Sequence, residues 1–461
     1  MPMPLPHRTR RSLLQAGGAS LLAGQFPQAL YPSTSASTLR RPRIKSCLIL
    51  FQAGGVSQID TIDMRPQGPA NVRGEFSAIA SKVPGMPVCE HLPMLAKQMD
   101  KVCVLRSMYH RMLCHNPACY CALSGRDVGE SKAVSSQTPA TPDDYPNFGS
   151  VVSMYRPAVT GLPSFVSLPF LLFNGPAQTP GQNAGLLGSR YDPFLVEKDP
   201  SQPGYQIDEL QQRQGINAGR LADRRRLQQD YNTQQTTLSA TRDSSRLNVY
   251  YRRALSMLNT PRSRTAFDLA REDKVTRERY GMNVVGQSTL LGRRLIGAGV
   301  PFVVVYSPVK RIEGLSWDTH TNNFPKLKND LLPPADQSLS ALLEDMGQRG
   351  MLDETLVIWM GEFGRTPRIG YTQSNNTSNQ TGRDHHPYCY SIVLAGAGVT
   401  PGSYFGASDK DGWYPHSSPV HPGDLAATIY DAFGINPRQT IYDTLGRPHR
   451  LCEGDVVSGL F

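Results

Sequence analysis

Five short apolar runs constrain the fold of this 461-residue chain more than any other feature of its sequence. Each run is rich in β-branched or aliphatic residues, and the loops around them are rich in glycine or polar residues. Continuous apolar strands of this kind are usually buried on both faces, as in a parallel sheet covered by helices. The runs are SCLILF (46–51), KVCVLRSM (101–108), PFVVVYS (301–307), TLVIWM (355–360) and YSIVLAG (390–396).

Helical patterns lie between these runs. Residues 338–350 form an amphipathic segment that ends in glycine, and residues 423–435 repeat apolar side chains at intervals of three and four. Strands that alternate with helices predict an α/β doubly wound architecture with a mostly parallel central sheet.

The middle of the chain has a different composition. Residues 205–280 are rich in Arg, Gln and Asp and contain no convincing strand, which predicts a charged helical insertion packed beside the sheet. Residues 127–147 and 176–204 are rich in Pro, Gly, Ser and Asp. We expect them to be long loops, which often border the active face of an α/β fold.

The N-terminal segment predicts export. Arg10 and Arg11 precede a weakly apolar, Gly/Ala-rich stretch and small polar residues at 33–37. This pattern resembles a twin-arginine signal, and a disordered basic tail is the alternative. We therefore expect a signal peptide over residues 1–37, a periplasmic location and one folded domain over residues 38–461.

The formal net charge of +10 does not predict a nucleic-acid partner. Residues 1–45 hold seven Lys or Arg and no Asp or Glu, so most of the excess belongs to the leader and the segment after it. No other basic block with interleaved aromatics occurs. After the N-terminus no apolar run approaches the length of about 18 residues that a transmembrane helix needs. Eight cysteines are too few for a disulfide scaffold in a chain this long.

Ionisable side chains gather next to the predicted strands. Ligands of open α/β sheets bind at the carboxyl ends of strands, so these groups can converge although they are distant in sequence. The candidates are Asp60 and Asp63 after the first strand, Asp318 and His320 after the third, Glu362 and Arg365 after the fourth, and Asp384, His385 and His386 before the fifth.

Carboxylates and imidazoles together suit Zn, Mn or Fe, whereas carboxylates alone suit Ca or Mg. We expect one or two divalent ions (Zn, Mn, Fe or Ca) at this edge of the sheet. Each residue also has a structural alternative: Asp318 can cap a helix, Glu362 can pair with Arg365, and His386 can pack in a loop. The expected ligands are Asp60, Asp318, His320, Glu362, Asp384, His385 and His386.

Seven motifs carry a resemblance to a known family: GGVSQIDTID, RSMYHRMLCHNPACYCALSGR, PNFGSVV, WDTHTNNFPKLKNDLLPPAD, MLDETLVIWMGEFGRTP, GRDHHPYCYSIVLAGAGV and DLAATIYDAFGI. With these motifs the chain resembles the "domain of unknown function 1501" family over nearly its whole length after the leader. That family is similar to the alkaline phosphatase and sulfatase superfamily, which implies an α/β/α sandwich with a two-metal core.

The superfamily resemblance implies roles residue by residue. Glu362 stands at a metal-binding aspartate position, and Phe363 replaces the histidine that follows it. Asp318 and His320 are similar to an Asp/His pair of metal ligands.

Two further ligand positions are implied. His385 or His386 resembles the last metal histidine before a buried strand, and Asp60 is the candidate for the early aspartate. The superfamily's own aspartate directly follows the first strand, where this chain has Gln52.

His115 falls on the nucleophile position of the sulfatase pattern, where other members have Ser, Thr or a modified Cys. Three roles follow for His115. It can be a metal ligand or general acid/base while activated water attacks. It can be a nucleophile that forms a phosphohistidine. Catalysis can also be lost, which leaves a binding protein on an enzyme's scaffold.

These observations predict an exported, metal-dependent hydrolase of sulfate or phosphate esters that uses metal-activated water. Catalytic roles are expected for His115, for its neighbour Asn116, and for Arg365, whose guanidinium suits an oxyanion. The substrate is expected to be a small-molecule or polysaccharide ester. The alternative is a non-catalytic binding or assembly protein with a partner in the envelope.

Overall fold

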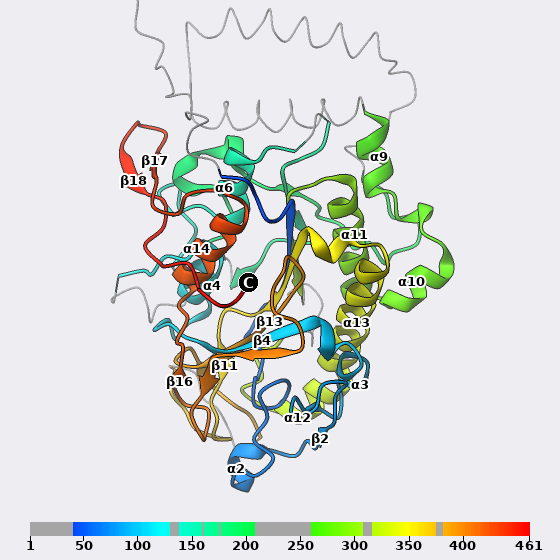
Figure 1. Ribbon diagram of the computed structural model, residues 1–461, viewed down its shortest axis with the longest axis vertical. Coiled ribbons are helices and arrows are strands. Elements are labelled where there is room, and N and C mark those ends of the chain that lie inside the picture. Colours follow the sequence, from blue (N-terminus) through cyan, green and yellow to red (C-terminus); the bar gives the residue numbers. More distant parts are fainter. Residues whose placement is uncertain are drawn as a thin grey trace, which may run out of the picture. The chain divides into compact units, whose positions relative to one another are not determined.

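The computed structural model describes seven segments of the chain, which Figure 1 shows as a coloured ribbon. The predicted signal peptide and most of the predicted insertion lie outside them. The described residues are 40–129, 138–158, 161–174, 177–207, 260–307, 316–374 and 381–461.

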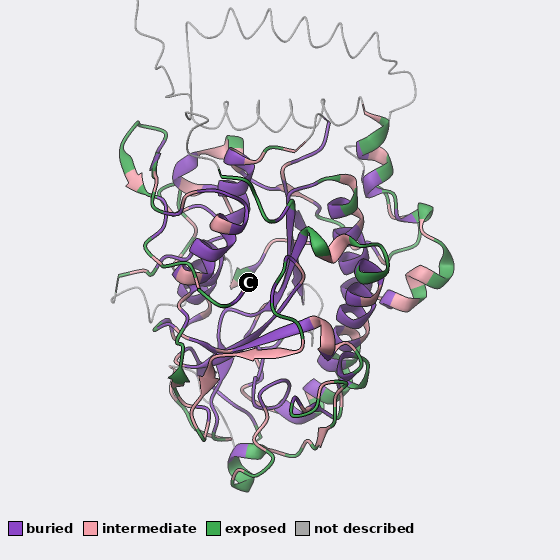
Figure 2. Cartoon of the chain, viewed as in Figure 1, coloured by how far each residue is buried: buried purple, intermediate pink, exposed green. Residues whose placement is uncertain are grey.

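An eight-stranded sheet forms the centre of the fold. Its strands are rich in Val, Leu, Ile and Phe, and the central ones are buried along their whole length, as Figure 2 shows in purple. The spatial order is β14 (Ser403–Phe405), β4 (Val102–Met108), β13 (Tyr390–Ala395), β10 (Thr355–Met360), β1 (Ser46–Gln52), β9 (Phe302–Ser307), β5 (Phe165–Leu168) and β8 (Phe194–Leu195).

The sheet is mostly parallel, as predicted. Only β13 runs against its neighbours, β4 and β10. All five predicted strands are confirmed as β1, β4, β9, β10 and β13. The expectation of a loop throughout 176–204 is wrong at β7 (Ala177–Gln178), which pairs with β6 (Phe173–Asn174), and at β8, which pairs with β5 through two residues. Such short strands leave no hydrophobic pattern in the sequence.

Helices cover both faces of the sheet (Figure 1). One layer contains α11 (Val284–Ala298), α13 (Leu332–Gln348) and α10 (Lys274–Tyr280), which pack on one another. The other contains α4 (His115–Ser124), α6 (Phe148–Tyr155) and α14 (Pro422–Ala432). The α/β/α sandwich predicted from the sequence is therefore confirmed.

Local sequence explains how α11 packs against the sheet. Its N-cap Asn283 accepts a hydrogen bond from the Gly286 amide at 2.9 Å, and the left-handed Gly299 ends the helix. A Cβ at Gly292 would lie 3.1 Å from Leu48 and Val305 side chains on β1 and β9. Glycine therefore lets the helix approach the centre of the sheet closely.

The described end of the predicted insertion is helical, with α9 (Pro261–Phe267) and α10, whereas residues 208–259 lie outside the described part.

Among the described residues no helix is long and apolar enough to span a membrane. The eight cysteines all lie in the described segments, are buried, and form no disulfide. The remaining elements are α2 (Ala70–Arg73), α3 (Pro93–Ala96), α12 (Asn323–Lys326), β2 (Ala78–Ile79), β3 (Val88–Cys89), β11 (Gly364–Arg365), β12 (His385–His386), β15 (Ala407–Ser408), β16 (Pro415–Ser417), β17 (Thr440–Tyr442) and β18 (Pro448–Arg450).

Candidate metal centre

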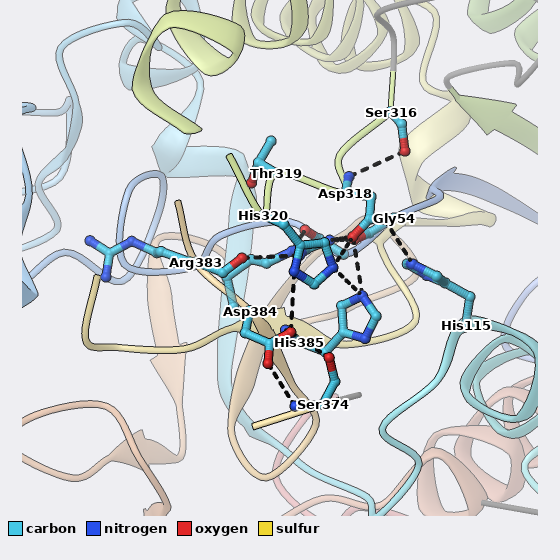
Figure 3. A network of polar contacts seen from close by, with 12 residues as sticks. Gly54, His115, Ser316, Asp318, Thr319, His320, Ser374, Arg383, Asp384 and His385 are labelled. Atoms are coloured by element: carbon cyan, nitrogen blue, oxygen red, sulfur yellow. Dashed lines mark hydrogen bonds and ion pairs between the residues drawn. The ribbon is translucent and has the colours of Figure 1, made fainter. Parts of the chain in front are cut away.

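The loops after β9 and β10 bring several predicted site residues together (Figure 3). Asp318 and His320 lie in the segment after β9, and Glu362 follows β10. His385 lies on β12, which pairs with β11 so that Arg365 is opposite His385. His115 begins helix α4. The predicted convergence at the strand ends is therefore present for these residues.

Asp318 is the centre of this cluster. Its Oδ1 lies 2.9 Å from His320 Nε2, 3.1 Å from His385 Nε2 and 2.6 Å from Arg365 Nη2. Its Oδ2 lies 3.2 Å from His115 Nε2. Burial alone would raise the pKa of Asp318, but the charges of His115 and Arg365 hold it well below its ordinary value. The carboxylate is therefore ionised.

The surroundings of His385 fix the position of its proton. Its Nδ1 lies 2.7 Å from the carbonyl oxygen of Leu113, which can only accept, so Nδ1 carries the hydrogen. Burial, with the charge of His115, lowers the pKa of His385 to about 3, so the ring is neutral. The lone pair of Nε2 is thus directed at Asp318.

His320 lies between two carboxylates. Its Nδ1 is 3.2 Å from Asp384 and its Nε2 is 2.9 Å from Asp318. With the proton on Nδ1, the Nε2 of His320 presents a lone pair 3.0 Å from the Nε2 of His385. In that tautomer two lone pairs and a carboxylate oxygen converge on one position. A divalent cation fits this position, because two imidazoles and a carboxylate are a common ligand set for Zn and Fe.

Asp384 supports this site without facing it. Its oxygens accept hydrogen bonds from the Gln373 amide at 2.5 Å, from the Ser374 amide and hydroxyl at 2.6 Å, and from the His385 amide at 2.8 Å. Burial raises the pKa of Asp384, but these bonds bring it below its ordinary value. Its contacts suit a residue that orients His320 better than a metal ligand.

His115 joins two carboxylates. Its Nδ1 lies 2.8 Å from Glu362 Oε1 and its Nε2 faces Asp318. Burial would lower the pKa of His115, but the charge of Asp318 and hydrogen bonds to both carboxylates raise it to about 9. The imidazole of His115 therefore adds a positive charge to the cluster, and its side chain is 19% exposed.

Glu362 is fully buried at the end of β10. Its Oε1 also accepts the amide of Gly54 at 2.8 Å, whereas Oε2 has no hydrogen-bond partner in the described structure. Gly54 has a φ of 110°, and a Cβ there would lie 2.5 Å from the Asp318 amide. Glycine is therefore required where this loop passes the cluster. Glu362 holds His115, and its contacts do not extend to His320 or His385.

Arg365 is buried completely and its donors face protein acceptors. Besides Asp318, it donates to the carbonyl oxygens of Gly54, Gly55 at 3.2 Å and Arg383 at 3.1 Å. These contacts fix Asp318 in place. They do not favour the predicted role of Arg365 as a donor to substrate.

Four predicted candidates lie outside the cluster, and one of them, Asp63, forms an ion pair with Arg65 at 2.9 Å. Asp60 forms a buried, bidentate ion pair with Arg383 at 2.8 Å. Asn116 donates to the Thr138 carbonyl at 2.8 Å and so holds a neighbouring loop. His386 follows His385 on β12 and points to the opposite side, where its Nε2 lies 2.8 Å from the Trp413 carbonyl.

Sequence reasoning missed His110, which supports Glu362. His110 Nε2 donates to the Glu362 carbonyl at 2.6 Å, and its Nδ1 accepts the Met112 amide at 3.0 Å. Burial lowers the pKa of His110 to about 4, which keeps the ring neutral. One feature of the sequence could have pointed to His110: it is a polar residue two positions after the predicted strand 101–108.

A second group of metal-binding residue types consists of Cys121, Asp127 and His421. His421 Nδ1 accepts the Gly423 amide at 3.0 Å, so its proton is on Nε2, 3.0 Å from Asp127 Oδ1. The thiol of Cys121 donates to the same oxygen at 3.2 Å. All three side chains are thus joined by hydrogen bonds through Asp127 Oδ1, and the group is a hydrogen-bonded clasp between α4 and α14.

Comparisons with solved structures find resemblance to sulfatases and related hydrolases. A sulfatase, PsFucS1 from Pseudoalteromonas sp., is 13% identical with a TM-score of 0.35, and the match covers 86% of this chain and 68% of that one. A protein in the alkaline phosphatase superfamily from Vibrio parahaemolyticus is 12% identical with a TM-score of 0.35, covering 93% and 76%. The phosphonate monoester hydrolase SpPMH from Silicibacter pomeroyi is 11% identical with a TM-score of 0.35, covering 85% and 74%.

No curated protein matches the chain in sequence. The family model described as "Protein of unknown function (DUF1501)" matches residues 44–461, and the chain belongs to that family.

Proposed function

We propose that this protein is an exported hydrolase of sulfate or phosphate esters with a single divalent ion held by Asp318, His320 and His385. The observation that carries the proposal is the 3.0 Å separation of the two Nε2 atoms beside the Asp318 carboxylate. A bound divalent ion would supply Lewis-acid stabilisation of the charge that develops on the ester and would activate water. Export rests on the twin-arginine pattern of the leader.

His115 occupies the space beside Asp318. The imidazole of His115 lies between Glu362 and Asp318, and its ring centroid is 4.4 Å from that of His385. The two carboxylates are thereby joined through a positively charged side chain, which would repel a second cation. This arrangement favours one ion per chain.

His115 supplies the proton chemistry in this proposal. Glu362 fixes the ring through Nδ1, so Nε2 is the atom directed at the centre. A proton on Nε2 can pass to the leaving oxygen of the ester, a role that contributes typically 10²- to 10⁴-fold. A nucleophilic role is disfavoured, because the contact with Asp318 keeps that nitrogen protonated.

The other residues hold the geometry. Arg365 anchors Asp318 with an ion pair at 2.6 Å, and Asp384 orients His320. Asp318 is 30% exposed on its side chain, so substrate can approach the cluster from the side of Asp318 and His115.

A panel of esters tests the proposal. The purified full chain is treated with chelator, reloaded with Zn, Mn, Fe(II) or Ca, and assayed on 4-nitrophenyl sulfate, 4-nitrophenyl phosphate and bis(4-nitrophenyl) phosphate. We expect turnover that the chelator removes and one metal restores. His385→Ala should lack this turnover and the matched Asp127→Asn variant, in the hydrogen-bonded clasp, should keep it. A folded, metal-loaded protein that turns over none of the esters would favour the binding or assembly role.

A further inference from the structure

Phe363 lies against the metal centre although its side chain has no polar atom. Its ring stacks on the imidazole of His385, with the centroids 4.4 Å apart and an angle of 30° between the planes. The same ring lies 5.2 Å from the imidazole of His115, at an angle of 41°. One phenyl ring therefore contacts both a proposed metal ligand and the proposed proton donor.

The surrounding residues hold the ring of Phe363 in place. Phe363 is buried and packs in a small apolar cluster with Met112, Ala118 and Cys121, of which the last two lie on α4. On another side, a Cβ at Gly55 would lie 2.5 Å from the ring. Glycine at this position therefore leaves just enough room for the phenyl ring, which is closely confined.

The hydrogen bonds of the two histidines do not set the tilt of their rings. Nδ1 of His385 lies 2.7 Å from the Leu113 carbonyl oxygen, and Nδ1 of His115 lies 2.8 Å from Glu362 Oε1. Each bond fixes one nitrogen, whereas contact with the face of a neighbouring ring also limits how the imidazole can tilt. Because the lone pair of an imidazole nitrogen lies in the plane of the ring, the tilt decides where Nε2 points.

The apolar character of Phe363 suits this position. The phenyl ring has no hydrogen-bond donor or acceptor, so it does not compete with a cation for the Nε2 atom of His385. It covers one side of that imidazole, and apolar groups around a metal site control the access of solvent. The guanidinium Cζ of Arg365 lies 5.9 Å from the ring centroid, within the range of a cation–π contact.

We propose that Phe363 is a positioning residue of the metal centre, whose ring sets the tilt of the His385 imidazole and so directs its Nε2 toward the ion. This inference rests on the proposed function, since it concerns the same centre. The ring also contacts His115, so it helps to keep the two imidazoles at their centroid separation of 4.4 Å.

Metal binding measured without turnover tests this role. The purified full chain is loaded with Co(II), whose visible absorption bands depend on the geometry of its ligands. Phe363→Leu and Phe363→Met remove the ring and keep an apolar side chain. Phe148→Leu is the matched control, because Phe148 is equally buried on α6 and its ring neighbour is Tyr430 on α14.

We expect both Phe363 variants to show shifted absorption bands. Competition with a chelator should show that they bind Co(II) at least about tenfold more weakly than the wild type does, as is typical when a residue that orients a metal ligand is lost. Phe148→Leu should behave as the wild type does. Thermal unfolding shows which variants fold, and methionine, which fills irregular gaps, keeps the test open if leucine leaves too large a cavity.

Unchanged bands and affinity in a folded Phe363 variant would overturn the inference, and so would a wild type that binds no Co(II). Equal changes in Phe148→Leu would also overturn it, because the loss of any buried ring would then disturb the centre. The ester panel separates the two proposals. If the Phe363 variants change as expected but the wild type hydrolyses no 4-nitrophenyl ester, the proposed hydrolase is wrong and the role of Phe363 stands.

Discussion

The Nε2 atoms of His320 and His385 lie 3.0 Å apart, and the opposite nitrogen of each ring faces an oxygen acceptor. When His320 carries its proton on Nδ1, the two Nε2 lone pairs face each other and a cation between them would bind both; a proton on His320 Nε2 would instead make a hydrogen bond to His385. In the Cys121, Asp127 and His421 clasp, by contrast, the backbone amide of Gly423 forces the proton onto the inward nitrogen. The position of one proton therefore separates a metal centre from a hydrogen-bonded clasp.

Asp384→Asn should weaken metal binding without unfolding the protein. The asparagine side chain has only one accepting oxygen, so it cannot keep all the contacts by which Asp384 is held beside His320. Losing a residue that orients a metal ligand typically costs about 10- to 100-fold in metal affinity. Competition titration with a chromophoric chelator measures the change. Asp127→Asn, which alters the clasp, serves as the control, and equal affinity in Asp384→Asn and wild type would contradict this role.

His115→Gln should slow the hydrolysis of esters with poor leaving groups. We expect a loss of about 10²- to 10⁴-fold in kcat, because the leaving oxygen then departs without a proton. Esters of 4-nitrophenol, which leave easily, should lose much less. Comparison of alkyl and 4-nitrophenyl esters checks this prediction, and equal losses on both would exclude His115 as the proton donor.

Asp60→Asn should destabilise the fold and leave metal content unchanged. The Asp60–Arg383 pair is completely buried, and removing one partner of such a pair costs about 3–5 kcal/mol in unfolding free energy. Urea unfolding measures the loss, and elemental analysis measures the metal. If a folded Asp60→Asn variant loses the metal, this prediction is wrong and Asp60 is a metal ligand, as the sequence predicted.

Arg365→Gln should also lower the unfolding free energy by about 3–5 kcal/mol, because it leaves Asp318 and several backbone carbonyls without their donor. Arg368→Ala is the control, since that side chain is exposed and a change of about 0.5 kcal/mol or less is expected. Similar stabilities for the two variants would contradict the anchoring role of Arg365.

The stability of the protein should fall as the pH decreases from about 6.5 to about 4, in part through His110. Its folded pKa of about 4 lies below the unfolded value of 6.5, so the unfolded state binds the additional proton in this range. The contribution of His110 is fully present above pH 6.5 and decreases by about 1.4 kcal/mol per pH unit below it. Urea unfolding of wild type and His110→Gln should differ in this slope. Parallel profiles would contradict a neutral, buried His110.

The sequence predicted the sheet well, because long buried strands such as β1 and β10 leave continuous apolar runs. It also predicted that Asp318, His320, Glu362 and His385 would meet, because strand ends share an edge. It could not distinguish His385 from His386, which depends on which side of a two-residue strand faces the centre. The sequence also could not predict that Asp60 pairs with Arg383, or that Arg365 donates to the Gly54 and Gly55 carbonyls. These are tertiary contacts between residues far apart in the chain.

Metal content tests the central claim most directly. Elemental mass spectrometry on the purified full chain, reloaded with metal, would compare the wild type with His320→Ala, His385→Ala and the control His421→Ala. We predict close to one Zn, Mn or Fe per chain in the wild type and in His421→Ala, and loss of that ion in the other two variants. A folded wild type that binds no ion, or an ion that both substitutions leave in place, would contradict the account.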